Sequence, residues 1–409
     1  MTNRIASLWL IPVLAFVTFL AGCGGGADSA GDGADSASRP VVIGLAAPFT
    51  GRSAAQGKQM EYGVKAAIAE INENGGLGGQ PVELLSQDDE SRPDTAAQVA
   101  QRFVNNPDVA VVIGHFNSSC SIAGSEIYNA AEMLQITPAS TNPDVTIGKP
   151  WTYRNIFNDI FQGQTLADYA SKRLGHTKAA VLYENDSYGK GLYDYFKARA
   201  AENGLELTSE MSYETETTDF RPLLTQVKDG DPEILVVCGL YRAGGQIAAQ
   251  AAELGIKLPI IGGDGLLSDD LISIGGEPTE GLYVTAPFLF ELAGDRGEAF
   301  AARVRKQSGV EPDAWAALAY DAMMLVNDAV ENHGVAVDSK AIRDHLKTID
   351  SEEVAFDGLT GLTYFDENGD CLKPVQIAQV RDGKFQAAPI QMTDELTEAL
   401  KSDSEGAAE

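Results

Sequence analysis

Two short polar segments carry the hydroxyl groups best suited to bind a small charged ligand. They are residues 114–119 and residues 137–143, and each directly follows a short apolar run, such as residues 109–113. Short apolar runs bounded by glycine or proline are typical of buried parallel strands. We therefore expect Ser118 and Thr141 at the carboxyl ends of adjacent strands, where open α/β sheets bind their ligands.

The spacing between these segments leaves room for one crossover helix, residues 121–132. Hydroxyl groups and free backbone N–H groups near the start of a helix suit a carboxylate. The pattern predicts a clamp for an anion or for an amino acid. The alternative is structural: Ser118 and Ser119 would only cap the helix, and residues 142–143 would only turn the chain.

Two later segments also follow a strand and open a helix. Residues 183–191 contain Tyr188, and residues 262–266 contain Asp264 between glycines. Glycines around a single acid expose its carboxylate to a facing ligand, so both segments are candidates for the binding edge of a second sheet. The alternatives are that Tyr188 packs on its own domain as a loop aromatic and that Asp264 caps a helix.

Motifs of the common catalytic classes do not fit this sequence. Residues 51–59 look like a phosphate-binding loop, but Gln59 stands where serine or threonine must reach magnesium. No Gly-x-Ser-x-Gly motif surrounds Ser118 or Ser119. His115 lies near these serines, but the sequence indicates no acid that would orient it in a catalytic triad. We interpret His115 as a strand-end residue with satisfied hydrogen bonds, and we do not expect an enzyme.

A metal centre is not indicated either. Residues 366–370 begin like a calcium loop, but the glycine and the final glutamate of that loop are missing, which favours a hairpin turn. His176, His333 and His345 are scattered in helical or linker contexts. No metal and no cofactor is therefore expected.

The first 22 residues have the outline of a secretory signal peptide. Arg4 supplies one positive charge, residues 6–20 are nearly all apolar, and small residues precede Cys23. The apolar run is short for a membrane-spanning helix and contains Pro12. The Leu-Ala-Gly-Cys ending resembles the bacterial lipobox, which implies cleavage before Cys23 and attachment of a lipid to it.

The segments at the two ends of the chain are expected to lack a packed core. Residues 23–39 consist mainly of small residues and aspartate and predict a flexible tether, with a root-mean-square reach of about 20–24 Å. Residues 393–409 form an acidic tail that we expect to be disordered. The net charge of −29 repels phosphate backbones, so no nucleic-acid partner is expected.

Three cysteines remain besides Cys23, and they allow at most one disulfide bond. Their pairing stays open, with three free buried thiols as the alternative. These residues are Cys120, Cys238 and Cys371.

From residue 40 onward, short apolar runs alternate with helical patterns in two successive series. Such alternation predicts βαβ units, parallel sheets and right-handed crossovers, so we expect an α/β fold of two doubly wound lobes. Residues 151–163 would form the first hinge, and the chain would end in strands joined by an Asn-Gly turn at residues 368–369. The expected strands are 41–46, 82–86, 109–113, 133–136, 179–183, 206–211, 234–237, 259–262 and 283–286, and the expected helices are 59–71, 95–104, 121–132, 191–202, 220–227, 244–254, 294–307, 313–332 and 339–348.

The order of these motifs resembles that of the leucine/isoleucine/valine-binding proteins, which are type I periplasmic binding proteins that deliver amino acids to ABC transporters. The resemblance covers about residues 42–380. The motifs that carry it are Ile43-Gly44 with Thr50-Gly51, residues 72–76, 87–89, 113–119 and 138–143, Arg154 with Asp159, Gln162-Gly163, residues 188–191 and residues 281–287.

The resemblance implies a hinged fold. Two Rossmann-like lobes would be joined by three hinge crossovers, near Asp159, Pro287 and Phe365, and would close on the ligand like a Venus-flytrap. The implied bounds are residues 40–158 and 288–365 for lobe 1, and residues 159–287 and 366–392 for lobe 2.

By the same resemblance, the α-carboxylate of the ligand would be bound by Ser118 and Thr141. Its α-ammonium would be bound by the carbonyl of Ala139, by Thr141 and by Asp264, while Tyr188 would close over the ligand. The other residues of the predicted ligand-binding set are Asn117, Ser140, Gln56, Leu240 and Tyr241.

Four departures from the family pattern concern the pocket and a disulfide. Asp264 stands where glutamate is usual, so its carboxylate reaches less far. Gln56 and Leu240 occupy positions that are often aromatic. The first-lobe disulfide of the family would need cysteines near Ser91 and Asn117, and neither is present.

These residues together predict a monomeric, lipid-anchored, extracytoplasmic receptor. It would capture an amino acid with a branched-chain or other apolar side chain and deliver it to the permease subunits of an ABC transporter, with the lipid as its only membrane attachment. Gln56 would also suit urea, a short amide or another small polar nitrogen compound, although Asp264 argues against an uncharged ligand. A sensory ligand-binding domain of the same fold is the remaining alternative.

Overall fold

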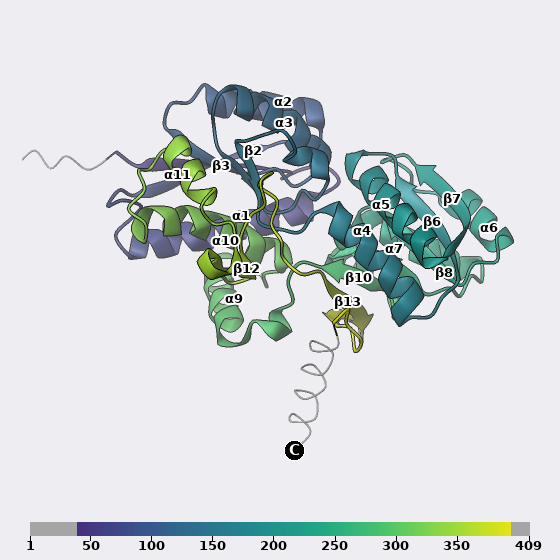
Figure 1. Cartoon of the computed structure of the whole chain (residues 1–409). Helices are drawn as coiled ribbons and strands as arrows, with labels where there is room; N and C mark the ends of the chain where they lie inside the picture. Colours follow the sequence, from purple (N-terminus) through teal and green to yellow (C-terminus); the bar gives the residue numbers. More distant parts are fainter. Residues whose placement is uncertain (1–38, 394–409) are drawn as a thin grey trace, which may run out of the picture. The chain divides into compact units, whose positions relative to one another are not determined.

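Two large β-sheets organise the part of the chain that the computed structural model describes, residues 39–393 (Figure 1). The first sheet has five parallel strands in the order β2-β1-β3-β4-β5. Because the chain adds β2 on one side of β1 and β3 on the other, a crevice opens at the carboxyl ends of β1 and β3. The strands are β1 (Val41–Ala47), β2 (Val82–Asp88), β3 (Val109–Gly114), β4 (Gln135–Thr137) and β5 (Thr152–Arg154).

The second sheet has seven strands in the order β14-β13-β10-β9-β8-β6-β7. Five of them are parallel, whereas β13 is antiparallel to both β10 and β14. The strand order reverses at β6, which places a second crevice between the carboxyl ends of β6 and β8. The strands are β6 (Lys178–Glu184), β7 (Glu206–Tyr213), β8 (Ile234–Cys238), β9 (Ile260–Gly262), β10 (Tyr283–Ala286), β13 (Gln376–Arg381) and β14 (Lys384–Ala387).

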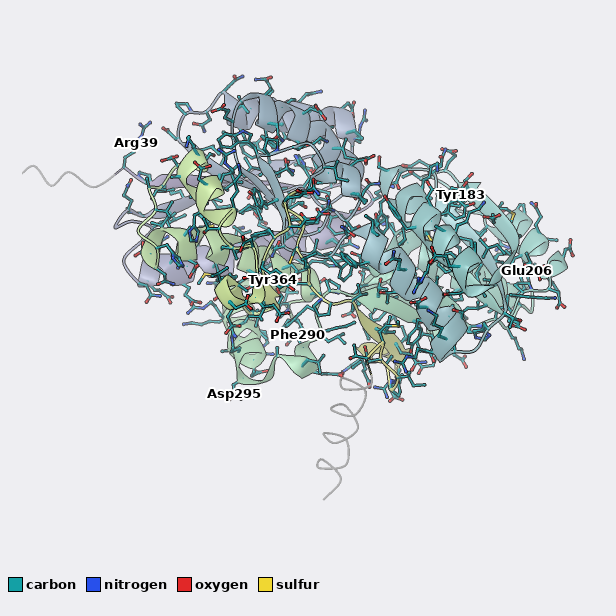
Figure 2. The ribbon with its side chains drawn as sticks, in the orientation of Figure 1. Arg39, Tyr183, Glu206, Phe290, Asp295 and Tyr364 are labelled. Atoms are coloured by element: carbon teal, nitrogen blue, oxygen red, sulfur yellow. The ribbon has the colours of Figure 1, made fainter. Side chains whose placement is uncertain are left out.

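The central strands are apolar along their whole length because helices cover both faces of a parallel sheet. All residues of β8 are buried, and β3 is buried except at Ala110. Edge strand β7 alternates instead, since part of it meets solvent. In Figure 2, Tyr183 of β6 and Glu206 of β7 mark the second sheet, and Arg39 marks the start of the described chain.

Helices from distant parts of the sequence pack together around the first sheet. Helices α1 and α10 pack on each other, as do α2 and α3, and α11 packs on α10. These helices are α1 (Ala54–Glu73), α2 (Pro93–Val104), α3 (Ser118–Ala130), α9 (Gly294–Ser308), α10 (Ala314–Glu331) and α11 (Ser339–Leu346). Those associated with the second sheet are α4 (Asp159–Asp168), α5 (Ser187–Asn203), α6 (Arg221–Asp229), α7 (Tyr241–Glu253) and α8 (Asp269–Gly275).

The chain passes between the two sheets three times. It leaves the first sheet after β5, returns after β10 to form α9 to α11, and leaves again for β13. The α/β fold of two parallel-sheet lobes joined by three crossovers is therefore confirmed, and both sheets belong to one compact unit.

Residues 151–163, predicted as the first hinge, contain the end of the first sheet at β5 and the start of α4, so the first passage between the two sheets lies within them. The side chain of Asn158 caps the first N–H groups of α4. One sequence prediction about the connections is wrong. The strands around the Asn-Gly turn do not form a hairpin: β12 (Gly361–Thr363) pairs with β11 (Phe356–Gly358), and only one bridge, Phe365 to Cys371, spans the turn. The Asp370 carboxylate, next to this bridge, accepts a 2.6 Å bond from Arg154.

Cys120, Cys238 and Cys371 are free and buried, so they form no disulfide with one another. Within residues 39–393, no helix is long and apolar enough to cross a bilayer. The predicted signal peptide, Cys23, nearly all of the tether and the tail beyond residue 393 lie outside the described residues.

Candidate functional site

One cavity lies where loops at the carboxyl ends of strands from both sheets meet. Its walls come from segments that follow β3 and β4 of the first sheet, from segments that follow β6, β8 and β9 of the second, and from the start of α10. The space between them is small, which limits a ligand to a small molecule. The lining residues are Phe116, Asn117, Ser118, Ala139, Tyr188, Leu240, Asp264, Gly265 and Trp315.

The start of helix α3 presents hydrogen-bond donors on the first-sheet side. Ser118 is its first residue, and the Ser118 hydroxyl accepts a hydrogen bond from the Asn142 N–H at 3.3 Å. The leading N–H groups of a helix have no intrahelical partner, and the helix dipole makes this end positive. Asn117 lies beside them, held by a 3.1 Å bond from its amide to Ser53. This arrangement can bind a carboxylate.

The loop after β4 carries Ala139 and Thr141. Ala139 lines the cavity, whereas Thr141 is not among the lining residues, and its hydroxyl is buried with no hydrogen-bond partner among the described residues. The guanidinium of Arg154 fixes this loop, because it donates to the carbonyl oxygens of Ser140 at 2.8 Å and Asn142 at 3.0 Å. The loop is therefore preorganised before any ligand enters.

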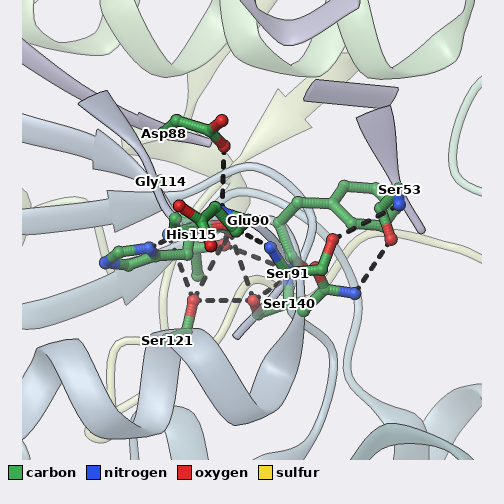
Figure 3. A network of polar contacts seen from close by, with 12 residues as sticks. Ser53, Asp88, Glu90, Ser91, Gly114, His115, Ser121 and Ser140 are labelled. Atoms are coloured by element: carbon green, nitrogen blue, oxygen red, sulfur yellow. Dashed lines mark hydrogen bonds and ion pairs between the residues drawn. The ribbon is translucent and has the colours of Figure 1, made fainter. Parts of the chain in front are cut away.

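Ser140 points into the protein rather than into the cavity. Its hydroxyl shares a 2.7 Å hydrogen bond with Ser121 and donates to the Phe116 carbonyl at 2.9 Å, as part of the network in Figure 3. It is not among the residues that line the cavity. Ser140 therefore holds the two loops together and does not face a ligand in this structure.

His115 is buried next to this network, and both of its ring nitrogens have partners. Nδ1 lies 2.7 Å from an oxygen of the buried Asp89, and Nε2 lies 3.4 Å from the Tyr128 hydroxyl. The expectation that no acid would orient His115 is thus wrong. The interpretation as a satisfied strand-end histidine is confirmed, since Nε2 faces a tyrosine and not a serine nucleophile.

Asp264 faces the cavity from the second-sheet side. One of its carboxylate oxygens accepts a 2.7 Å bond from the Tyr188 hydroxyl, and the other is buried without a partner among the described residues. Burial raises the pKa of Asp264 to about 6. The Tyr188 hydroxyl also accepts a 2.9 Å bond from the Gly265 N–H. The alternative that Asp264 caps a helix is wrong, because its side chain caps none.

Asp159 is a second buried acid that the sequence analysis did not assign to the site. One of its oxygens accepts a 3.1 Å bond from Gln162, and the other has no partner among the described residues. Burial and then the charge of Asp264 raise its pKa well above the ordinary range. Gln162 links the two acids, because its side-chain oxygen accepts the Asp264 N–H at 2.7 Å. A cation placed between these carboxylates would relieve their repulsion.

An apolar wall completes the cavity. The rings of Phe116 and Trp315 pack edge to face with centroids 5.0 Å apart, and Leu240 lies on the second-sheet side. The Trp315 N–H donates to the Leu267 carbonyl at 3.1 Å, so the indole is fixed. Phe116 lies within a segment singled out by sequence, whereas nothing in the sequence connects Trp315 to that segment.

Gln56 and Tyr241, like Ser140 and Thr141, are not among the residues that line the cavity. Gln56, in α1, is buried, and its side-chain amide has no hydrogen-bond partner among the described residues. Tyr241 belongs to the hydrophobic core beside the second sheet, where its hydroxyl accepts a 3.1 Å bond from Arg242. The position next to it, Leu240, is the one that reaches the cavity.

Polar bonds outside the cavity connect the two halves of the site. Arg52, just before α1, forms ion pairs with Glu184 and, at 2.8 Å, with Asp186. The Asn142 amide donates to the Ser187 carbonyl at 2.5 Å. These contacts hold the cavity closed from two sides.

Residues 40–384 match the family model described as periplasmic binding protein. The chain belongs to the periplasmic binding protein family. It is 34% identical over 351 residues to a Leu/Ile/Val-binding protein homologue of Brucella abortus, covering 84% of this chain and 92% of that relative.

Two solved structures of periplasmic binding proteins are also similar. A leucine-binding protein from Thermotoga maritima superposes with a TM-score of 0.80 at 31% identity, over 87% of this chain and 99% of that one. A branched-chain amino acid transporter substrate-binding protein from Streptococcus pneumoniae, in complex with isoleucine, has a TM-score of 0.80 at 29% identity, over 86% of this chain and all of that one.

Membership in this family confirms the predicted fold and decides between the broad classes of function. Periplasmic binding proteins are extracytoplasmic solute receptors, so this chain is a binding protein and not an enzyme.

Proposed function

We propose that this periplasmic binding protein captures a free amino acid with an apolar, above all branched-chain, side chain and delivers it to the permease of an ABC transporter. The observation that carries the proposal is the pairing of opposite groups across one small cavity. The free carboxylate oxygen of Asp264 faces it from one side and the N-terminal end of α3 faces it from the other.

Each part of such a ligand finds a complementary group. The α-carboxylate would bind the Ser118 hydroxyl and the leading N–H groups of α3. The α-ammonium would bind Asp264, with the Ala139 carbonyl and the free Thr141 hydroxyl as further partners. The side chain of the ligand would lie against the rings of Phe116 and Trp315. Hydrogen bonds to charged groups contribute about 1.5–3 kcal/mol each, which compensates the lost hydration of the zwitterion.

Closure of two lobes would couple binding to recognition by the permease. We propose lobe bounds of 40–158 with 288–365 and of 159–287 with 366–392, because each sheet draws its strands from one of these sets. Ser118 and Asp264 then lie on different lobes, so only the closed form makes both contacts. The ligand would therefore shift the population toward that form.

We also propose that the receptor is monomeric and anchored by a lipid on Cys23, with no other membrane attachment. Replacement of Cys23 with alanine should release the protein from the membrane fraction. The same amount in the membrane fraction as for the unchanged protein would contradict the anchor but not the ligand site.

The ligand is tested by a thermal-shift screen of the twenty amino acids with urea and short amides. Leucine, isoleucine or valine should raise the melting temperature most, and calorimetry should then show that Ser118→Ala weakens binding at least about tenfold. Ser119→Ala is the matched control, because it removes a neighbouring hydroxyl that does not line the cavity. Equal affinity for the two variants would contradict the site.

A neutral nitrogen compound is the weaker candidate. Such a ligand would bind the Gln56 amide, but Gln56 does not line the cavity. The buried acids Asp159 and Asp264 favour a ligand with a cationic group instead. A rise in melting temperature with urea or amides, and none with amino acids, would make the neutral nitrogen compound the stronger candidate.

A further inference from the structure

Two histidines and an aspartate meet near the ends of helices α10 and α11, and none of them lines the ligand cavity. Asp328 lies in the last turn of α10, His333 follows that helix, and His345 lies in the last turn of α11. One ligating atom from each lies within 4.8 Å of the others. The interpretation of His333 and His345 as scattered is therefore wrong, since their rings lie 4.4 Å apart.

The separation of these atoms fits the coordination sphere of a small metal ion. Nε2 of His333 lies 3.4 Å from Oδ2 of Asp328. Tetrahedral zinc with bonds of about 2.0–2.2 Å places neighbouring ligand atoms about 3.3–3.5 Å apart. Two of the three donors thus already have this spacing, and the third needs only a small side-chain movement.

The third donor is available for a ligand bond. Nε2 of His345 is buried and has no hydrogen-bond partner among the described residues. The Asn332 amide donates a 2.7 Å bond to the other oxygen of Asp328, an outer contact of the kind that orients metal-binding carboxylates.

The surroundings also favour a cation. Both α10 and α11 end here, and helix carboxyl ends carry partial negative charge. The chain as a whole carries a net charge of −29, which raises the local concentration of cations.

We propose that Asp328, His333 and His345 form a binding site for a divalent transition-metal ion, with zinc as the expected ion. Two imidazole nitrogens and one carboxylate oxygen suit zinc, copper or nickel rather than magnesium or calcium, which prefer oxygen ligands. Water would occupy the fourth position. The ion would join the end of α10 to α11 across the connecting loop, independently of ligand binding in the cavity.

The test uses the full chain purified in detergent. Zinc is titrated by calorimetry, and cobalt is added to read the visible spectrum of a tetrahedral site. We expect binding of one ion, a tetrahedral cobalt spectrum, and a loss of at least about tenfold in affinity for His333→Ala and for His345→Ala. A hundredfold excess of magnesium should not displace zinc.

The chain supplies a matched control in His176, which lies 3.8 Å from Glu233 and has no third ligand within residues 39–393. His176→Ala should bind zinc like the unchanged protein, and circular dichroism should show that all three variants are folded. Absence of zinc binding, or equal affinity in all three variants, would overturn the proposal. The second result would mean that the acidic surface attracts the ion without a site.

Discussion

Replacement of Asp264 by asparagine is predicted to have opposite effects on ligand affinity and on the stability of the empty protein. Asparagine has nearly the same shape and can still accept the 2.7 Å bond from Tyr188, so the packing of the site should be preserved. The change removes only the negative charge. If Asp264 were needed only for the fold, its replacement would not weaken ligand binding and at the same time stabilise the protein.

The two magnitudes follow from the environment of the carboxylate. Loss of the charged partner of the α-ammonium should cost about 1.5–3 kcal/mol, which raises Kd about 10- to 150-fold. The pKa of Asp264 is raised from 3.8 to about 6, so the ionised group destabilises the empty folded state. The difference corresponds to at most about 3 kcal/mol. This penalty grows between pH 3.8 and 6 and is complete above pH 6.

Calorimetry at pH 7.5 would give Kd, and thermal unfolding without ligand would give the stability difference. We expect weaker binding together with a higher melting temperature for Asp264→Asn. At pH 4 the two empty proteins should have nearly equal stability, because Asp264 is then largely protonated in the folded protein. Unchanged affinity, or a variant that is less stable at pH 7.5, would refute the reasoning.

Three further predictions concern neighbouring features of the site. In the unchanged protein, ligand affinity should fall about tenfold between pH 7 and pH 5, because the ligand ammonium requires the ionised form of Asp264. Asp264→Asn should lack this fall, and an affinity that does not change with pH in either protein would contradict the assignment. Phe116→Ala should reduce the affinity for leucine about tenfold more than the affinity for alanine, because it removes part of the apolar wall. Competition binding would measure both affinities, and an equal loss for both amino acids would show that the Phe116 ring does not contact the side chain of the ligand. Arg52→Ala should weaken ligand binding about tenfold in calorimetry, because the closed form would then bury Glu184 without its ion-pair partner, a cost that the open form does not have. Arg221→Ala is the control: it removes an exposed ion pair and should leave the affinity unchanged.

Local patterns predict the half of the site that lies directly after strands. The runs at residues 109–113 and 179–183 indicate strands because parallel strands are apolar throughout, and the helices that follow these strands carry Ser118 and Tyr188 in their first turns. The glycines around Asp264 identified it in the same way. These predictions needed only the strand ends, which short-range periodicity reveals.

Other parts of the site depend on contacts between distant segments. Trp315 lies in the first turn of a helix whose position against Phe116 is set by packing, and no local pattern encodes that approach. Asp159 lies near the predicted first hinge, and no local pattern indicates that it is buried beside a second acid. His333 and His345 are brought together by two separate helices, and sequence spacing cannot show this.

The contact between Arg154 and Asp370 has a consequence for how the receptor matures. Arg154 shapes the loop that carries Ala139, yet its carboxylate partner comes from the last crossover, more than two hundred positions later. The loop that carries Ala139 therefore cannot reach its final conformation until the last crossover has been synthesised and has packed against Arg154. Ligand capture thus reports a fully assembled molecule, and a fragment that stops before this crossover would leave the export pathway without a working receptor.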